Sequence, residues 1–594
     1  MTEPSCTVHI LPDGIRVKAR QGEILSDVIL RADVPLSVYC NKRGICGKCA
    51  VRVVNGPLPF QEPAEEALLR SRGLGPDHRL ACLYEIRGDV TVETLPGSRL
   101  QRIAVLETGL ATDVVPDPAV KKLALALEKP ALACPSATLE RLRSLLKVPN
   151  LTLPLPVLSK LGGEPVSSGR TFTAVLYGDR EVLDIEPGDT SSEVYGLAID
   201  LGTSTVVAEL VDLRTGETVG RASAMNSQAS YGADVVSRIT FAFENPDNLR
   251  RLQSAVVQLL NELVAEASRA SGVPRHRIYD AVVAANTAMN HLLCGVPVDS
   301  LALAPFHAAF ASLPPFPASD VGLNLNPRAK VQLVPNIASF VGGDITAGLV
   351  ASEVSARSGR VLFIDLGTNG EIVLKRGRDL AAASTAAGPA FEGMNISCGM
   401  LAAPGAVHQA EWRDGGFKLR TIDGLPPAGI CGTGLIDVLA VSLAQGLLGP
   451  DGKIAGPGRK IPFGDGLVLT QQDVRDVQLA VAAVRTGVKL MLREFQTPSR
   501  QLDRVLVAGA FGSSLDTANS VALGLLPNIA AGRITFVGNA SLAGARKLLL
   551  SAPERAAAEE LASSIAHVSL AARPDFQDEF VKALEFRPYR AGEK

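Results

Sequence analysis

The chain has 594 residues, and at roughly 150 residues per domain this length predicts about four structural units. Hydrophobic residues make up 46% of the sequence and charged residues 20%, which excludes disorder over most of the length. The 59 Lys and Arg residues nearly balance the 61 Asp and Glu residues, so the formal net charge is −2. Because proteins that bind nucleic acid in general carry a basic excess, this balance argues against a nucleic-acid partner.

The N-terminal sequence has no basic start followed by an apolar run, so we expect no secretory signal. The longest apolar stretch without charge covers residues 300–319 and contains Pro305, Pro314, Pro315 and Pro317. Prolines at this density break a helix repeatedly, so the stretch is a poor membrane span. We therefore expect a cytoplasmic protein without a membrane partner.

Residues 1–97 are expected to form a small α+β domain. Apolar alternation predicts two strands over residues 6–19, joined by a turn at Pro12-Asp13-Gly14. Helical spacing of apolar residues follows over residues 24–32. The remaining expected elements are a strand at 50–54, a helix at 64–70 and closing strands at 80–84 and 90–94.

Residues 98–118 are expected to be a linker, and residues 119–193 a small middle domain. Seven prolines interrupt the stretch from 116 to 156. An amphipathic helix is predicted over residues 138–146, and a strand pair with a turn at Gly178-Asp179 over residues 171–185. Composition alone indicates no function for this part.

From residue 194 to 594, strands rich in Val, Ile and Ala alternate with long Ala/Leu helices, which is typical of an α/β domain. The sequence Ala198-Ile-Asp200-Leu-Gly202-Thr203-Ser204-Thr205 recurs as Phe363-Ile-Asp365-Leu-Gly367-Thr368-Asn369-Gly370. The two copies are 165 residues apart, which is the size of half a large domain. The repeat predicts a duplicated, two-lobed unit.

Four of the nine cysteines lie in the first domain, with the spacing Cys40-x5-Cys46-x2-Cys49-x32-Cys82. The loop around the first three is rich in glycine, which lets the backbone fold closely around a metal cluster. Four thiolates at this spacing favour a 2Fe–2S centre, because the plant-type pattern differs from it only by one residue in the first gap. The longer first gap resembles that of the adrenodoxin-like branch of the ferredoxins. A structural zinc site remains an alternative. Such sites usually have two closely spaced cysteine pairs, however, and this sequence has a single pair, Cys46 and Cys49. The other cysteines have no metal-ligand spacing and are expected to be buried thiols.

Both copies of the repeat predict a strand, a tight turn and a second strand. Such a turn presents backbone N–H groups and hydroxyls to a phosphate, here from Gly202, Thr203, Ser204 and Thr205 in one copy and Gly367, Thr368, Asn369 and Gly370 in the other. The aspartate at each strand end, Asp200 or Asp365, can hold Mg²⁺ through water or position a water molecule. Two copies that face each other would hold opposite sides of a triphosphate.

A third element supports a nucleotide site. Residues 504–516 predict a buried strand, a glycine turn with Gly509 and Gly512, and a helix. In this order the three elements resemble the phosphate and adenosine motifs of the acetate and sugar kinase, Hsc70 and actin superfamily. Two further segments, residues 283–291 and the segment around Gly432 and Gly434, resemble its connecting motifs. We also expect Asp344, after Gly342-Gly343, to lie beside the cleft.

A ferredoxin followed by an ATP-binding unit in one chain resembles the ATP-dependent reductive activators of corrinoid proteins, over essentially the whole length. The resemblance implies a β-grasp ferredoxin domain, a small middle domain and a duplicated actin-like, ribonuclease H-like ATPase domain. It implies one-electron reduction of an inactive Co(II) corrinoid protein to Co(I), coupled to ATP and Mg²⁺. It also implies a corrinoid protein or domain of a methyltransferase as the partner. We further expect an external electron donor, and the middle domain is a candidate to form a homodimer.

The resemblance places the cluster ligands at Cys40, Cys46, Cys49 and Cys82, and catalytic carboxylates at Asp200, Asp344 and Asp365. Glu392 and Ser397, in the glycine-rich segment 388–399, are candidates to contact the corrinoid. Other members often carry an arginine after the Gly-Met pair of this segment, whereas Leu401 stands here.

Three alternatives remain. The first is a phosphotransferase of the sugar-kinase type with a regulatory cluster. The second is an activator of the 2-hydroxyacyl-CoA dehydratase type, whose closely spaced pair of cluster ligands Cys294, Cys398 and Cys431 do not supply. The third is a nonenzymatic electron carrier.

Overall fold

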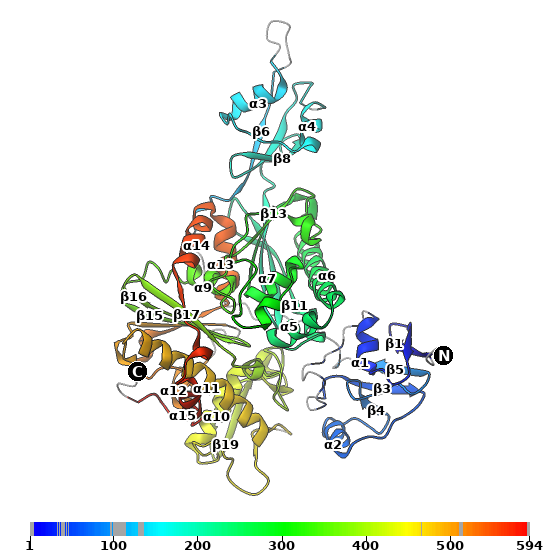
Figure 1. The fold of residues 1–594 in the computed structure, drawn as a ribbon, viewed down its shortest axis with the longest axis vertical. Helices are drawn as coiled ribbons and strands as arrows, with labels where there is room; N and C mark the ends of the chain where they lie inside the picture. Colours follow the sequence, from blue (N-terminus) through cyan, green and yellow to red (C-terminus); the bar gives the residue numbers. More distant parts are fainter. Residues whose placement is uncertain are drawn as a thin grey trace.

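The computed structural model contains an N-terminal domain, a middle domain and two large lobes (Figure 1). The described residues are all except 1–4, 33, 35, 37, 39–41, 43, 45–46, 96–97, 99–113, 129–135, 165, 465, 510–514 and 591–594. In Figure 1 the middle domain projects from the end of the first lobe, and the N-terminal domain lies beside both lobes. No helix in the described part of the chain has the length and apolar character needed to cross a membrane.

The N-terminal domain is a five-stranded mixed sheet with the order β2-β1-β5-β3-β4. Its elements are β1 (Ser5–Leu11), β2 (Ile15–Arg20), α1 (Leu25–Arg31), β3 (Ala50–Asn55), α2 (Pro63–Ser71), β4 (His78–Leu80) and β5 (Val90–Thr94). β1 and β5 run parallel and the other pairs antiparallel, and the apolar face of α1 packs on this sheet. The prediction of mixed α+β structure is confirmed.

The expected strand over residues 80–84 is wrong beyond its first residue. β4 ends at Leu80, and the chain then turns, with the Leu83 amide donating to the Leu80 carbonyl at 2.9 Å. β3 begins at Ala50, which pairs with Leu80, so the ladder has no further partner residue. Cys82 therefore lies in a turn at the end of the sheet.

The middle domain is a three-stranded antiparallel sheet, β6-β7-β8, covered by two helices. Its elements are β6 (Val120–Leu125), α3 (Thr138–Leu146), α4 (Leu155–Leu161), β7 (Phe172–Tyr177) and β8 (Glu181–Pro187). The predicted helix and strand pair are both present, and Lys147 ends α3 in the left-handed conformation, with φ 57°.

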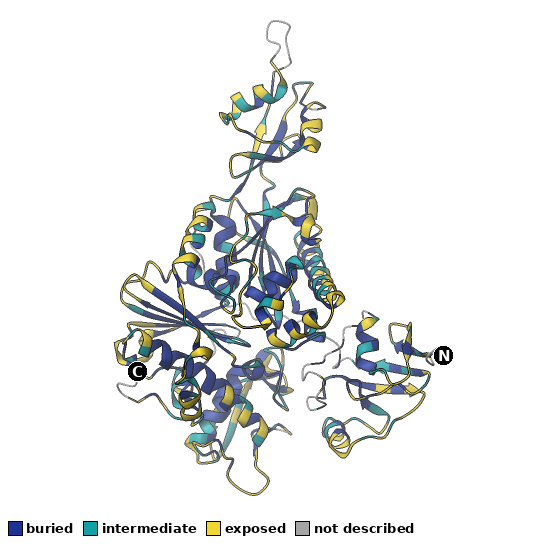
Figure 2. Cartoon of the chain, in the orientation of Figure 1, coloured by how far each residue is buried: buried dark blue, intermediate teal, exposed yellow. Residues whose placement is uncertain are grey.

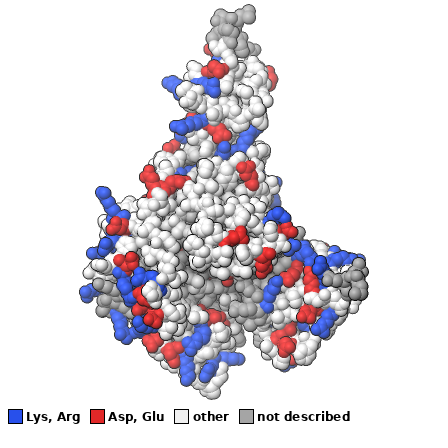
Figure 3. Space-filling model, viewed as in Figure 1, with Lys and Arg blue, Asp and Glu red and all other residues white. Residues whose placement is uncertain are grey.

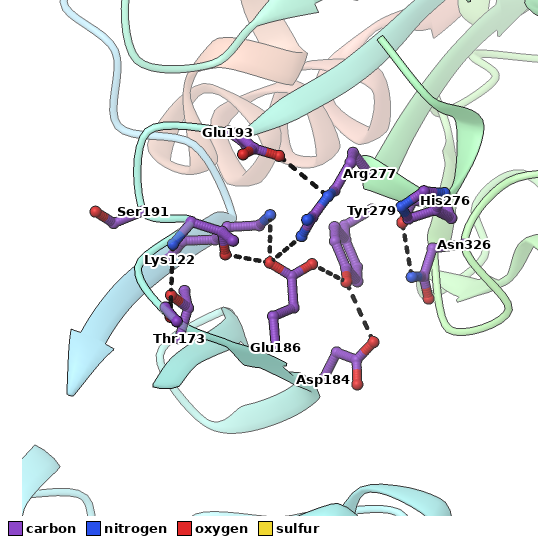
Figure 4. A network of polar contacts seen from close by, with 12 residues as sticks. Lys122, Thr173, Asp184, Glu186, Ser191, Glu193, His276, Arg277, Tyr279 and Asn326 are labelled. Carbon is purple, nitrogen blue, oxygen red and sulfur yellow. Dashed lines mark hydrogen bonds and ion pairs between the residues drawn. The ribbon is translucent and has the colours of Figure 1, made fainter. Parts of the chain in front are cut away.

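A buried polar network attaches the middle domain to the first lobe (Figure 4). Glu186 of β8 accepts from Lys122 Nζ of β6 at 2.9 Å, and from Tyr279 Oη of the first lobe at 2.6 Å. Arg277, also in the first lobe, approaches Glu186 at 2.6 Å. Because Glu186 has charged or hydrogen-bonding partners in both units, the network fixes their relative orientation.

The first lobe has a six-stranded sheet in the order β11-β10-β9-β12-β14-β13. Its elements are β9 (Tyr195–Leu201), β10 (Thr205–Asp212), β11 (Thr218–Met225), α5 (Val235–Glu244), α6 (Pro246–Ser271), β12 (Ile278–Ala285), α7 (Thr287–Cys294), α8 (Asp299–Ala302), β13 (Phe316–Pro317), β14 (Lys330–Leu333) and α9 (Gly343–Ala351). One face of the sheet is covered by α6 and α7.

The second lobe has a six-stranded sheet in the order β24-β23-β15-β16-β17-β25. Its strands are β15 (Arg360–Leu366), β16 (Gly370–Arg376), β17 (Asp379–Thr385), β18 (Ala406–Arg413), β19 (Gly416–Thr421), β20 (Gly429–Ile430), β21 (Lys460–Pro462), β22 (Val468–Thr470), β23 (Arg504–Gly509), β24 (Ile534–Gly538) and β25 (Ala566–His567). Its helices are α10 (Gly432–Ala444), α11 (Gln471–Glu494), α12 (Thr517–Leu523) and α15 (Phe576–Ala583). Two further helices, α13 (Ala540–Leu550) and α14 (Ala552–Ser564), follow β24 in sequence but pack with elements of the first lobe.

The two large sheets repeat one topology, which confirms the predicted duplication. In each, the strand that carries the motif aspartate lies between an antiparallel hairpin partner, β10 or β16, and a parallel strand, β12 or β23. Both sheets are buried along most of their length (Figure 2).

Helices α9 and α13 lie between the two sheets. Ala347 and Val350 of α9 pack toward the first sheet, and Ile345 and Leu349 toward the second. A Cβ on Gly544 of α13 would lie 2.0 Å from the Ala347 carbonyl oxygen. Only glycine permits this close crossing.

Candidate functional site

Two of the four predicted cluster cysteines lie in the described part of the chain, and the structure holds them at one end of the N-terminal sheet. The Ala81 amide donates to the Cys49 carbonyl at 3.1 Å, so Cys49 and Cys82 come from adjacent backbone segments. Their exposed fractions are 1% and 4%. Cys40 and Cys46 lie outside the described residues.

The residues around these thiols fit a cluster. Gly44 and Gly47 have φ of 70° and 64°, which is the conformation that glycine adopts without strain. A Cβ on Gly44 would lie 2.6 Å from Leu83 Cδ1, so the Leu83 side chain lies against Gly44. Buried thiols at the edge of an apolar core, beside a glycine-rich loop, suit an iron–sulfur centre.

The two copies of the repeat meet at their turns. The first hairpin turn (residues 202–204) joins β9 to β10, and the second hairpin turn (residues 367–369) joins β15 to β16. Ser204 Oγ lies 3.3 Å from Thr368 Oγ1. Residues 164 positions apart in sequence are therefore in contact, and the predicted juxtaposition of the two motifs is confirmed.

Glu392 joins the two turns through its carboxylate. One oxygen accepts a hydrogen bond from Ser204 Oγ, and the other accepts from Thr368 Oγ1 at 2.8 Å. Burial raises the pKa of Glu392, against the lowering effect of these two hydroxyls and of the nearby Arg238 charge. The structure thus places Glu392 between the turns; contact of Glu392 or Ser397 with a corrinoid stays a prediction.

Four carboxyl groups gather behind the turns: Asp200, Asp344, Asp365 and Glu371. Burial and the repulsion of Asp344 and Asp200 raise the pKa of Asp365 to about 8. Burial and the charge of Asp200 likewise raise the pKa of Asp344 to about 7. Because the groups repel one another, a cation close to them would be stabilised.

The duplicated aspartates have different surroundings. Asp200 accepts from Asn539 Nδ2 and from Ser541 Oγ, both at 2.8 Å. Burial raises the pKa of Asp200, but these two donors oppose the shift. No such donor to Asp365 is present among the described residues, so the two lobes are equivalent in fold but not in electrostatics.

Two helix N-termini point toward the same region. Asn286, the N-cap of α7, donates from Nδ2 to Thr203 Oγ1 at 3.0 Å. A Cβ on Gly342, the N-cap of α9, would lie 2.3 Å from Asn286 Cα, so the two helix starts are in backbone contact. Unpaired N–H groups at such ends favour anions.

The expected adenosine element lies next to the second hairpin turn. Gly509, the last residue of β23, pairs with Leu366 and has φ 112°. Gly432 and Gly434 begin α10, and a Cβ on Gly434 would lie 2.2 Å from the Val407 carbonyl oxygen. Gly512 lies outside the described residues.

Sequence reasoning did not find Arg238, Glu371, Asn539 or Ser541. Arg238 is fully buried in α5 and donates to the Thr203 carbonyl at 2.6 Å. Burial lowers its pKa to about 9, although Asp234 and Glu392 partly offset this effect. An arginine within an amphipathic helix resembles a surface residue, and Asn539 resembles an ordinary helix cap, so the sequence held no distinguishing signal.

The N-terminal domain contacts both lobes. Ser230 Oγ of the first lobe donates to the Leu36 carbonyl at 3.0 Å. On the second lobe, Lys48 Nζ lies 3.4 Å from the Gly399 carbonyl oxygen, and Arg72 Nη2 lies 3.5 Å from that of Ser397. A cavity of about 440 Å³ between Val38, Lys42 and α5 borders this contact.

Comparison with known proteins agrees with this arrangement. Residues 8–87 match the family described as a 2Fe-2S iron-sulfur cluster binding domain. Residues 109–192 match the "RACo linker region", residues 195–357 the "RACo middle region", and residues 360–591 the "C-terminal domain of RACo the ASKHA domain". The profile called a linker region thus spans the unit called the middle domain here.

A relative from Eubacterium limosum, "Corrinoid activation enzyme RamQ", is 30% identical over 602 residues, covering 96% of this chain and 97% of that protein. The chain belongs to the family of reductive activators of corrinoid proteins. A solved structure, "Reductive activator for corrinoid,iron-sulfur protein", is 34% identical with a TM-score of 0.76 and covers 98% of both chains. A Co(II) methylated amine-specific corrinoid protein reductase from Methanosarcina barkeri is 27% identical, over 66% of this chain and 77% of its own length.

Family membership confirms the fold class. This reductive activator combines a 2Fe–2S ferredoxin domain with an actin-like ATPase domain. Membership of this family therefore excludes the three alternative functions considered from the sequence, none of which is the activation of a corrinoid protein.

Proposed function

We propose that this chain reduces an inactive Co(II) corrinoid protein of a methyltransferase system to the Co(I) state, by one electron and at the expense of ATP. The observation that carries the proposal is that the domain holding the cluster cysteines contacts both lobes whose hairpin turns meet at Ser204 and Thr368. A nucleotide held between the turns would therefore be bound by the same two lobes that the electron-transfer domain contacts.

The difference in reduction potential between the cluster and the corrinoid explains why the chain needs both a ferredoxin domain and an ATPase domain. Plant-type 2Fe–2S clusters have potentials near −400 mV, and we expect the Co(II)/Co(I) couple to lie lower. A gap of about 0.2 V costs roughly 4–5 kcal/mol per electron. Nucleotide binding can supply this energy if the activator grips one cobalt state more tightly than the other.

The cluster ligands in this proposal are Cys40, Cys46, Cys49 and Cys82, of which the two described ones are buried and adjacent. A 2Fe–2S cluster supplies one-electron transfer when bound. The apolar core of the domain includes Cys49 and Cys82 and keeps these two thiols from water.

In this proposal, residues of four segments contact the nucleotide. They lie in the first hairpin and its turn (Gly202, Thr203, Ser204 and Thr205), in the second hairpin and its turn (Gly367, Thr368, Asn369 and Gly370), at the start of α10 (Gly432 and Gly434), and at and after the end of β23 (Gly509 and Gly512). We assign the hydroxyls and amides of the hairpin turns to the phosphates, and the glycines of β23 and α10 to the adenosine, since both allow close approach of a flat ring.

Asp200, Asp344 and Asp365 are the proposed catalytic carboxylates. Within the described residues no group of three His, Cys, Asp or Glu side chains is arranged to hold a metal directly. Mg²⁺ binds nucleotides with several of its waters retained, and such an ion would neutralise phosphate charge beside the repelling carboxylates. We therefore infer contact through water.

We assign residues 1–97 to the ferredoxin domain, 98–118 to a linker, 119–193 to the middle domain and 194–594 to the two-lobed ATPase domain.

Exposed apolar side chains support two further partners. Phe60 (81% exposed) and Leu83 (42%) lie on the N-terminal domain, where an external electron donor would dock. Leu145 (47%) and Leu155 (78%) lie on the middle domain, where a second copy would form a homodimer. Charges of both signs are interspersed on the face shown in Figure 3.

The test is anaerobic mixing of the reconstituted chain with reductant, ATP and a Co(II) corrinoid protein, with the visible spectrum followed for Co(I). We expect Co(I) to form only with ATP. Cys49→Ser should abolish the reaction, whereas Cys294→Ser, which alters a thiol outside the cluster, should not. Formation of Co(I) at an equal rate without ATP would refute the proposal.

A further inference from the structure

Glu392 is bonded to both hairpin turns that the proposed function assigns to the nucleotide phosphates. Its carboxylate accepts hydrogen bonds from the two hydroxyls, Ser204 Oγ and Thr368 Oγ1, that we assign to the phosphates. An anionic group thus joins the two lobes from within the chain. A hydroxyl has one proton to donate, so neither side chain can donate to Glu392 and to a phosphate at the same time.

The segment that follows Glu392 is a closed loop. A Cβ on Gly399 would lie 2.0 Å from the Gly393 carbonyl oxygen, and one on Gly393 would lie 2.8 Å from the Met400 carbonyl oxygen. The two ends of the segment are therefore packed backbone against backbone. Because packed backbone does not compress, a displacement of residue 393 moves residue 399 as well.

The far end of this loop holds the N-terminal domain. The carbonyls of Ser397 and Gly399 lie 3.5 Å and 3.4 Å from the cationic groups of Arg72 and Lys48. Lys48 immediately precedes the cluster ligand Cys49. These are long hydrogen bonds, which a small displacement breaks.

The loop also has an anchor on the second lobe. The Ser397 amide and hydroxyl both donate to Asp473 Oδ1, at 2.7 Å and 3.0 Å. Met394 packs in an apolar cluster with Met225 and Ala229 of the first lobe. The loop thus contacts both lobes, so a displacement of either lobe would move it.

We propose that Glu392 is a positioning residue that takes the place of phosphate when no nucleotide is bound. Nucleotide binding displaces its carboxylate by competition for the two hydroxyls and by like-charge repulsion. The loop of residues 393–399 then shifts, and its contacts with Lys48 and Arg72 are lost. The nucleotide state thereby controls whether the cluster-bearing domain is docked on the second lobe.

This inference rests on the proposed nucleotide site and adds the route from that site to the ferredoxin domain. The test is amide hydrogen exchange of the full holoprotein, with and without a non-hydrolysable ATP analogue, together with the affinity of that analogue. In the unchanged protein, we expect the analogue to increase exchange in residues 393–400 and in the segment that begins at residue 47.

Two substitutions separate the effects of Glu392. Glu392→Ala should show the increased exchange without nucleotide and bind the analogue about 10-fold or more tightly, since the hydroxyls are no longer occupied. Glu392→Gln loses the charge but can still bond to both hydroxyls, since its Oε1 accepts from one of them and its Nε2 donates to the other. It should bind the analogue more tightly while exchange without nucleotide stays low. Glu411→Gln, at an exposed pair with Arg413 in the same lobe, is the control and should change neither.

The outcomes distinguish this inference from the proposed function. If the analogue binds but exchange in residues 393–400 is unchanged, or if both Glu392 variants bind it with unchanged affinity, the positioning role is refuted while the nucleotide site stands. If no analogue binds at millimolar concentration, the nucleotide site and the positioning role are both refuted.

Discussion

Substitution of Gly509 by alanine tests whether the end of β23 sets the geometry of the nucleotide site. Gly509 has φ 112°, a conformation that costs a residue with a side chain about 1–3 kcal/mol. The new Cβ would lie 2.3 Å from the Leu366 carbonyl oxygen and 3.1 Å from Asp365 Oδ1. Relief of the first contact to an ordinary separation requires one strand to move by about 1 Å.

This movement has a defined consequence, because Leu366 is the residue before the second hairpin turn. A displacement of about 1 Å in a binding site can cost up to 100-fold in function. We therefore expect Gly509→Ala to weaken binding of a fluorescent ATP analogue by about 10- to 100-fold. The expected destabilisation is about 2–4 kcal/mol, from strain and the backbone contact together.

Gly532→Ala is the matched control, since no atom lies within 4 Å of its Cβ position and its φ is ordinary. It should bind the analogue as the unchanged protein does. If Gly509→Ala also binds within about threefold of the unchanged protein, the strand end does not set the site geometry and the reasoning is wrong.

Two further substitutions address stability. Lys122→Met removes a cation whose side chain is fully buried and bonded to Glu186. Because Arg277 still neutralises Glu186, we expect the free energy of unfolding to fall by only about 1–2 kcal/mol. The measurement is thermal unfolding, with Lys121→Met, at a partly exposed lysine of the same strand, as the control. Burial alone would raise the pKa of Glu579, but hydrogen bonds from Lys489 and neighbouring cations lower it to about 2. Stability from this depressed pKa is present above about pH 4.5 and lost as the pH falls toward 2, so Glu579→Gln should cost about 1–3 kcal/mol at pH 7 and progressively less below pH 4.5.

The predictions for Lys122→Met and Glu579→Gln can each be contradicted by one result. A higher melting temperature for Lys122→Met would mean that desolvation of the lysine outweighs its hydrogen bond. For Glu579→Gln, chemical denaturation at pH 7 and pH 3 should be compared with Asp578→Asn, whose side chain is exposed. An equal loss at both pH values would show that the carboxylate charge contributes nothing.

The local features of the fold were predictable because they depend on neighbouring residues. Helix α3 was expected over the residues that form it, since its apolar spacing is unambiguous. The repeat around Asp200 and Asp365 predicted two equivalent hairpins because the aspartate, the glycine and the flanking apolar strands occur within ten residues. The strand expected over residues 80–84 failed because its length depends on where β3 begins.

The candidate site itself was predictable only in part. Its glycines and aspartates lie in motifs, but Glu392 joins turns that precede it by 188 and 24 residues. Arg238 contacts Thr203 from a helix that has no motif. Such contacts depend on how the two lobes pack, and no local pattern encodes that packing.

The position of α13 between the sheets has a consequence during synthesis. Leu548 and Leu549 complete an apolar cluster with Ala198 and Val207 of the first lobe, yet the ribosome makes α13 about 350 residues after β9. At 5–20 residues per second this delay is roughly 20–70 s. During that time the apolar side chains of β9 and β10 that α13 covers in the folded protein lack this partner, so the first lobe cannot complete its packing before nearly the whole chain has been made.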